Sequence, residues 1–488
     1  MKKWKTLANP GDPTIWADVS NMWPTGRGSY ETADVYASDT SITATSEKDA
    51  MVSAWVFNAL SATRVYYFGK YLWELDTTLA TATDRTGALG ADAVANGGHA
   101  CQYGDITIAT RGTGATLISS SGGNFAALAG SPTAKFVCVQ SNCLLAFNTS
   151  ASADMFHASD VGDYTNWTTG EAVSRRLIEH NGPITGVAPW GSDVIVFKED
   201  AVFKLSYVGG QVKWRSEIVW KGIGMPNSAG GGSPVCATSR GLFFPGGASY
   251  STGRQAYYLF DGVSAPRQVN IEVDVGYGVG IPVYDPRLDM VQVTTQYSAS
   301  GDYGTFIYYY SLNDDAWGKH AELGEGVVFE PLFPIRGDGG AASGITTGGG
   351  TPARPLLRGR TTATNQFYKR VASSPSAAAG SSFVQTHKMG VSGPLFAETN
   401  GRFGPAAPVL RRRENYSSGS PALALTVDTY TELHDTTAAA TASVTESTLR
   451  DRFDFTKDAP FCQLKLTATD TDIEIDDISV KIAQAGRV

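Results

Sequence analysis

The sequence predicts an all-β protein, with a β-propeller of six blades followed by a C-terminal domain that resembles a β-sandwich. Short apolar strand pairs recur at intervals of roughly 35–50 residues and end in an aromatic-aspartate or aspartate-glycine turn. Four of these segments are Tyr71–Asp76, Val194–Leu205, Tyr257–Gly262 and Phe306–Asn313. A single four-stranded sheet of this size cannot bury both of its faces, whereas sheets arranged radially cover one another.

The amino-acid composition supports this fold class. Glycine accounts for 54 of the 488 residues and aromatic residues for 11%, while charged residues account for only 18%. This balance suits many short strands joined by tight turns and does not suit a helical bundle. The formal net charge of −8 argues against a general nucleic-acid-binding surface, although a local basic lining is still compatible with it.

The first 335 residues are expected to form an arm and the ring itself. Residues 1–50 are polar and rich in turns, as in Trp23–Tyr30, and predict an N-terminal arm with a closing strand. Pairing of that strand with the last blade would remove a vulnerable sheet edge. Residues 51–335 contain the recurring strand pairs and are expected to form the propeller. Within them, strand pairs start near Ala54, Ala100, Lys135, Ile184, Cys236 and Val283.

The composition changes after the propeller rhythm ends. Residues 336–380 are rich in Gly, Thr and Ala and poor in apolar residues, which predicts a loop or linker. The glycine run at its centre is Gly348, Gly349 and Gly350. Residues 381–488 resume strands without the earlier rhythm and predict the sandwich-like domain. Its clearest strands are Ala422–Val427, Phe461–Ala468 and Ile473–Ile482.

Candidate catalytic and metal-binding patterns are weak, so we expect no enzyme activity, no cofactor and no metal. The segment Ser159–Trp167 is similar to a sialidase-type Asp box, but its aspartate comes one position early and its tryptophan too late. The acidic run comprises Asp470, Asp472, Glu474, Asp476 and Asp477. It offers oxygen ligands for Ca²⁺ but lacks a central glycine, and alternating acids also describe the wet face of a strand.

Three consecutive arginines, Arg411, Arg412 and Arg413, form the only tight basic cluster in the sequence. Two interpretations stay open for them. They are either contacts for an acidic partner or passing DNA, or the solvated end of a strand, which we favour.

The cysteines and the N-terminus favour synthesis and folding in a cytoplasm. Five cysteines without a CxxC pair are expected to be buried reduced thiols, with a facing pair at Cys138 and Cys143 as the alternative. The start Met1–Lys5 is followed by polar sequence and does not resemble a signal peptide. No window approaches 18 apolar residues, so we expect no membrane span.

Seven segments give the chain a resemblance to a known family through their order. They are Gly104–Gly112, Asn124–Lys135, Ala158–Trp167, Val194–Leu205, Tyr258–Gly262, Tyr310–Trp317 and the C-terminal Ala485–Val488. In this order the sequence resembles the tail nozzle proteins, also called tail stabilisation or tail hub proteins, of short-tailed podovirus-type bacteriophages. The likeness spans roughly residues 20–320 and 380–488. It departs from the family pattern at an insertion-like loop, Gly247–Gly253, and at His157, where the family has tryptophan.

The resemblance implies a structural virion protein that forms a ring, typically of about six copies, at the distal end of the tail. Such a ring is assembled in the host bacterial cytoplasm, lies below the tail adaptor, extends the channel for double-stranded DNA, helps to retain the genome and docks fibres or spikes. The family has no catalytic residues to carry over. Candidate contacts with the channel or a partner are Arg411, Arg412, Arg413, Gly348, Gly349 and Gly350.

A second hypothesis comes from a different functional class. A tail-associated propeller that binds or degrades carbohydrate would use exposed Trp and Tyr rings to stack on sugars. The chain has 10 Trp and 21 Tyr residues, so the composition is compatible with that alternative. Release of reducing ends from host polysaccharide would distinguish the two hypotheses.

Overall fold

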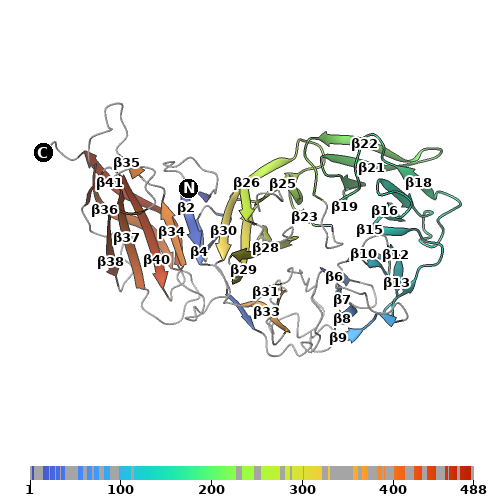
Figure 1. Ribbon diagram of the computed structural model, residues 1–488, viewed down its shortest axis with the longest axis horizontal. Coiled ribbons are helices and arrows are strands. Elements are labelled where there is room, and N and C mark those ends of the chain that lie inside the picture. Colours follow the sequence, from blue (N-terminus) through green and yellow to red (C-terminus); the bar gives the residue numbers. More distant parts are fainter. Residues whose placement is uncertain are drawn as a thin grey trace.

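The computed structural model shows an all-β protein whose described residues contain no α-helix (Figure 1). The structure describes residues 3–4, 15–20, 22–27, 29–32, 35–38, 53–58, 63–68, 71–75, 82–87, 98–111, 115–226, 233–246, 254–274, 281–285, 288–299, 302–320, 328–329, 356–360, 365–371, 382–386, 389–390, 401–412, 422–430, 437–446, 457–459, 461–469 and 473–484. These residues form a ring of sheets and a stack of strands beside it.

The ring is a β-propeller, as the sequence predicted, and its sheets are antiparallel. Blade one consists of β6 (Ser53–Asn58), β7 (Thr63–Phe68), β8 (Leu72–Leu75) and β9 (Ala82–Asp84). Blade two consists of β10 (Gly98–Tyr103), β11 (Ile106–Arg111), β13 (Ile118–Ser120) and β14 (Ala126–Ala127). Blade three consists of β12 (Ala115–Thr116), β15 (Thr133–Gln140), β16 (Cys143–Thr149), β17 (Met155–Ala158) and β18 (Val173–Arg176).

The remaining blades follow in chain order, except that the last one borrows a strand from the N-terminus. Blade four consists of β19 (Gly186–Trp190), β20 (Asp193–Phe197), β21 (Ala201–Gly209) and β22 (Lys213–Lys221). Blade five consists of β23 (Cys236–Thr238), β24 (Gly241–Gly246), β25 (Arg254–Phe260) and β26 (Arg267–Asp274). Blade six consists of β27 (Ile281–Asp285), β28 (Met290–Ala299), β29 (Asp302–Ser311) and β30 (Ala316–His320). Blade seven consists of β31 (Val328–Phe329), β32 (Leu356–Arg360), β33 (Asn365–Val371) and β5 (Val35–Ser38).

The described strands thus form seven blades, whereas the sequence led us to expect six. The additional blade comes from the range 336–380, which we expected to be a loop or linker and which contains β32 and β33. These two strands lack a long apolar run, and their sheet is completed by β5 from the N-terminal arm. A strand whose partner lies more than 300 residues away leaves no local signal in its own stretch of sequence.

The C-terminal part is built from two sheets, to which N-terminal strands also contribute. The first sheet contains β1 (Lys3–Trp4), β2 (Ile15–Ser20), β34 (Ser382–Thr386), β35 (Met389–Gly390), β37 (Ala422–Tyr430), β38 (Ala440–Glu446) and β40 (Phe461–Thr469). The second contains β4 (Tyr30–Thr32), β36 (Gly401–Arg412), β39 (Lys457–Ala459) and β41 (Ile473–Gln484). Through β3 (Met22–Pro24), this second sheet continues into β30 of blade six as one nine-stranded sheet.

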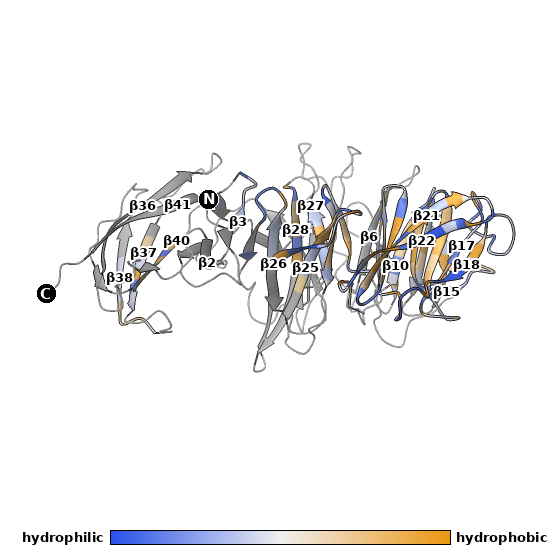
Figure 2. Cartoon of the chain, turned by 90° about the horizontal axis from the view of Figure 1, so that it is seen from above, coloured by the Kyte–Doolittle hydropathy of each residue, from blue (hydrophilic) through white to orange (hydrophobic). Residues whose placement is uncertain are grey.

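Neighbouring blades bury one another's faces, and β20 shows how. Val194 and Val196 pack against blade three, whereas Ile195 and Phe197 pack against blade five. Successive side chains of a strand point to opposite faces, so a strand between two blades needs apolar residues at every position. All four side chains are at most 1% exposed. Figure 2 shows the resulting hydrophobic colouring along the strands of this half of the ring.

The strand pair predicted to start near Lys135 is confirmed and forms a tight hairpin. β15 and β16 pair up to Gln140 and Cys143, and the two residues between them are Ser141 and Asn142. Both have positive φ, 51° and 57°, as a two-residue turn with the twist of the flanking strands requires. Asparagine tolerates this conformation better than most residues, so the Ser-Asn pair suits the turn.

Strands of blades one, two and three meet at a half-buried histidine. His99 on β10 makes edge-on ring contacts with Trp55 of β6 and Phe136 of β15, at centroid distances of 6.1 and 5.8 Å. Its Nδ1 accepts the backbone N–H of Val137 at 3.3 Å. Burial lowers the pKa of His99 to about 4, so the imidazole is neutral at pH 7.

The titration of His99 predicts a loss of stability in acid. The unfolded chain binds a proton at this histidine near pH 6.5, whereas the folded protein keeps it neutral down to about pH 4. The free energy of unfolding therefore falls as the pH drops from about 6.5 to about 4, by up to about 3 kcal/mol. The His99→Phe variant should lose less over this interval in urea unfolding. An equal loss in both proteins would contradict the assignment.

Candidate functional site at the propeller–sandwich junction

The junction between the propeller and the C-terminal sheets centres on the turn that joins β29 to β30. Tyr310, Leu312 and Trp317 around this turn are at most 2% exposed and belong to a core cluster that also includes sandwich residues. Within the turn, Ser311 Oγ accepts the backbone N–H of Asp314 at 3.1 Å. The buried aromatic residues thereby hold the backbone of the turn in one place.

Three consecutive side chains of this turn contact different parts of the molecule. Asn313 Oδ1 accepts a hydrogen bond from Nη2 of Arg240, which lies in the β23–β24 turn of blade five. Asp314, 5% exposed, accepts the backbone N–H of Gly26 on its Oδ2 at 2.6 Å. Asp315 Oδ1 accepts Nη1 of Arg267 from β26 at 2.9 Å. The turn thus joins blade five and the N-terminal hairpin to blade six.

The hydroxyl of Tyr310 adds to this connection. It donates to Asp315 Oδ1 and lies 3.1 Å from Nη2 of Arg267. Burial, followed by the hydrogen bond to Asp315, raises the pKa of Tyr310 above its ordinary value. The phenol therefore remains protonated and keeps donating to the carboxylate at neutral pH.

The hairpin β3–β4 extends the sheet of blade six beyond β30. The hydroxyl of Tyr30 donates to the carbonyl of Trp317 at 2.8 Å, and the Trp317 indole N–H donates to the carbonyl of Val269 at 2.8 Å. The rings of Trp23 and Tyr309 meet edge to face at 5.1 Å. Tyr30 and Trp23 are each 1% exposed, so the hairpin is part of the core.

The close approach of this hairpin depends on a glycine in β30. A Cβ added at Gly318 would lie 2.4 Å from the carbonyl oxygen of Met22 and 2.7 Å from Cα of Trp23. Both are backbone atoms, so a side chain at this position would force the hairpin away.

The sequence found one half of this junction and missed the other. The segment Tyr310–Trp317 was singled out by its resemblance, and the structure assigns it the junction turn. Its partners Gly26, Tyr30, Arg240 and Arg267 were not predicted as contacts. The turn-rich run containing Gly26 and Tyr30 was the available signal, but nothing in it names a partner nearly 300 residues away.

Only part of the predicted contact residues falls within the described structure. Arg411 and Arg412 end β36, where their register partners are Glu474 and Ile473 of β41. Arg413 and the glycine run Gly348, Gly349 and Gly350 lie outside the described residues.

The structure shows where the acidic run and the segment similar to an Asp box lie. Glu474, Asp476 and Asp477 lie within β41, and the described part of the chain contains no His, Cys, Asp and Glu group that could hold a metal ion. Asp160 organises the β17–β18 loop by accepting the backbone N–H groups of Val161 and Glu171, both on its Oδ1, at 2.9 and 2.8 Å. Its role in the described structure is therefore to brace a loop.

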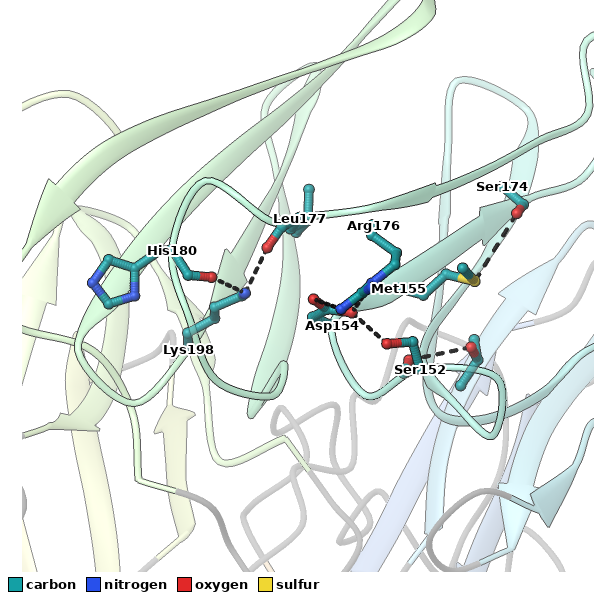
Figure 3. A network of polar contacts seen from close by, with 9 residues as sticks. Ser152, Asp154, Met155, Ser174, Arg176, Leu177, His180 and Lys198 are labelled. Carbon is teal, nitrogen blue, oxygen red and sulfur yellow. Dashed lines mark hydrogen bonds and ion pairs between the residues drawn. The ribbon is translucent and has the colours of Figure 1, made fainter.

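A second polar network fastens the connection between blades three and four (Figure 3). Lys198 is fully buried, and its Nζ donates to the carbonyls of Leu177 and His180 at 2.7 and 2.6 Å. Burial lowers the pKa of Lys198. Beside it, Asp154 accepts two hydrogen bonds from Arg176, at 2.8 and 2.9 Å, which lowers the pKa of Asp154. The network holds the segment 177–184, which leads from β18 to β19.

Comparisons with known proteins add little to this description. No family model matches the chain, and no curated protein matches it. The β-propeller domain of Cps50 (Swd1) from Myceliophteria thermophila aligns at 9% identity and TM-score 0.41, over 68% of this chain and 99% of that one. The extracellular domain of a hybrid two-component system from B. thetaiotaomicron aligns at 8% identity and TM-score 0.42, over 69% of this chain and 40% of that one.

A glycoside hydrolase also aligns, at 9% identity and TM-score 0.27, over 91% of this chain and 100% of that one. At these scores the assignment of the propeller rests on the sheets themselves. A search of the described residues for a helix long and apolar enough to span a membrane finds none.

The buried contact of the junction turn predicts a large cost for Asp314→Ala. The substitution removes a charged acceptor from the Gly26 N–H and should lower the free energy of unfolding by about 1.5–3 kcal/mol. Arg240→Ala, which removes an exposed contact of the same turn, should stay within about 0.5 kcal/mol of the parent protein. Urea unfolding measures both free energies of unfolding. If the two variants lose similar amounts, the contact of Asp314 with Gly26 stabilises the fold no more than the exposed contact of Arg240 does.

The buried side chain of Lys198 predicts a second difference in stability between two variants. Lys198→Met leaves two carbonyls without their donor and should cost about 2 kcal/mol or more. Lys204→Met removes a partly exposed ion pair with Glu217 and should cost about 1 kcal/mol or less. Thermal unfolding of the two variants measures the difference. Equal melting temperatures would contradict a stabilising role for the buried hydrogen bonds of Lys198.

Proposed function

We propose that the protein is a structural component of a short-tailed phage virion, the subunit of a distal tail nozzle ring. The ordered motifs that resemble the nozzle family support this proposal. The observation that carries it within the fold is the nine-stranded sheet, because it joins the propeller to the C-terminal sheets without a break in strand pairing. A subunit of a load-bearing tube benefits from such a continuous connection.

The junction turn explains how that connection resists deformation. Asp314 ties it to the N-terminal hairpin, and Asn313 and Asp315 tie it to blade five. Force applied to the C-terminal sheets therefore reaches two blades of the propeller through short, directional contacts. This is the behaviour expected of a part that anchors other proteins.

The charge of the chain is compatible with a channel for DNA. The 47 acidic side chains outnumber the 39 basic ones, so the net charge of −8 disfavours neutralisation of phosphates and double-stranded DNA would pass without adhering. In this proposal the partners are other copies of the chain, the tail adaptor, fibres or spikes, and DNA without sequence preference. Arg411, Arg412, Arg413 and the run Gly348–Gly350 remain the proposed contacts with them.

The proposal predicts a closed ring in solution or on assembly with the adaptor. Mass photometry should find a species of about six subunits, and averaged electron micrographs should show an axial hole. Incubation with host polysaccharide should release no reducing ends. A protein that remains monomeric under all conditions, or one that releases reducing ends, would contradict the nozzle and favour the carbohydrate-active alternative.

A further inference from the structure

We propose that the N-terminal segment 15–38, here called the strap, is a separable locking element. It carries β2 to β5, and it closes the propeller and fastens the C-terminal sheets to it at the same time. The strap undocks as one unit while the central blades stay folded. This inference concerns the chain itself and holds whether or not the nozzle proposal is correct.

Apart from β1, which pairs in parallel with β2, and from the pairing of β3 with β4 inside the strap, the pairing partners of the strap come from the second half of the chain. β2 pairs with β34, β3 with β30, β4 with β41, and β5 with β33. By contrast, blades one, two, four and five each pair strands that follow one another closely in sequence. Distant pairings carry a larger loop-closure cost and form later, so the strap docks onto blades that are already built.

The backbone pairing of the strap hairpin is brief. Among the described residues, β3 meets β30 at one register pair, Met22 with Lys319, and β4 meets β41 at two, Tyr30 with Ile475 and Glu31 with Glu474. Within blade six, β28 and β29 pair along their whole length. Segments with few backbone hydrogen bonds open at a lower free energy than the rest of a fold.

Side chains therefore supply much of the docking. Met22, Trp23 and Tyr30 are at most 1% exposed, and Tyr30 and Gly26 make the polar contacts with Trp317 and Asp314 described above. Gly318 provides the space into which the backbone of Met22 and Trp23 fits. These buried side chains and the space at Gly318 make docking specific and sensitive to a single substitution.

Undocking has two consequences at once. Blade seven loses β5, so the ring is no longer closed by strand pairing. The nine-stranded sheet loses β3 and β4, which lie between β30 and β41, so the propeller and the C-terminal sheets are no longer one continuous sheet. The strap thus couples ring closure to domain coupling in a single two-state step.

Hydrogen–deuterium exchange of the full chain tests this inference with a matched pair of glycines. Gly318→Ala places a Cβ against backbone atoms of the strap, whereas Gly123→Ala, in the β13–β14 turn, meets nothing within 4 Å. Exchange is compared in peptides from β3–β4, from β20–β21 of blade four, and from β37 and β40. Tyr30→Phe, which removes only the hydroxyl contact with Trp317, is a milder second variant that keeps the test valid if Gly318→Ala fails to fold.

We expect Gly318→Ala to raise exchange in β3–β4 by about tenfold or more and Tyr30→Phe to raise it severalfold. Exchange in β20–β21 should remain at the parent level in both, and Gly123→Ala should match the parent protein throughout. Unchanged exchange of β3–β4 in both strap variants would overturn the inference. Equal acceleration of β3–β4 and blade four would also overturn it, because the strap would then open only with the whole protein.

Discussion

The mutual burial of neighbouring blade faces is the interaction on which the rest of this structure depends. A single blade has two apolar faces and no means of covering them, as the continuously buried run from Val194 to Phe197 shows. Each blade therefore needs a neighbour on either side, and only a closed ring provides one for every blade. The polar contacts between blades, such as that of Gln140 with Gly191, follow from this arrangement.

Ring closure creates the second constraint, because a chain that builds blades in order ends with one incomplete sheet. Here β5 from the N-terminal arm completes blade seven beside β33. The strands just before β5 then have to pass blade six, where Gly318 leaves room for their backbone. The junction with the C-terminal sheets is built from the same stretch of chain. Closure and coupling therefore share the same few buried residues.

The use of the same buried residues for closure and coupling fits the proposed structural role. A part that holds other proteins in register needs rigid connections more than it needs a reactive group. The buried polar groups of the described structure fit that need, since Lys198 fastens an inter-blade connection and Asp314 fastens the junction. A buried lysine or carboxylate loses its contacts with water and makes directional hydrogen bonds with the protein instead. These hydrogen bonds favour one arrangement of the backbone.

The sequence by itself determined the fold class and many local elements. Apolar runs, as in Val194–Leu205, predicted strands, and the strand pair starting near Lys135 was predicted as well, because these signals lie within a few residues. The tertiary structure alone decided the seventh blade, the contact of Gly26 with Asp314, and the exclusion of a side chain at Gly318. These features join residues about 290 to 330 positions apart, and no local pattern of side chains encodes which distant strand will be its partner.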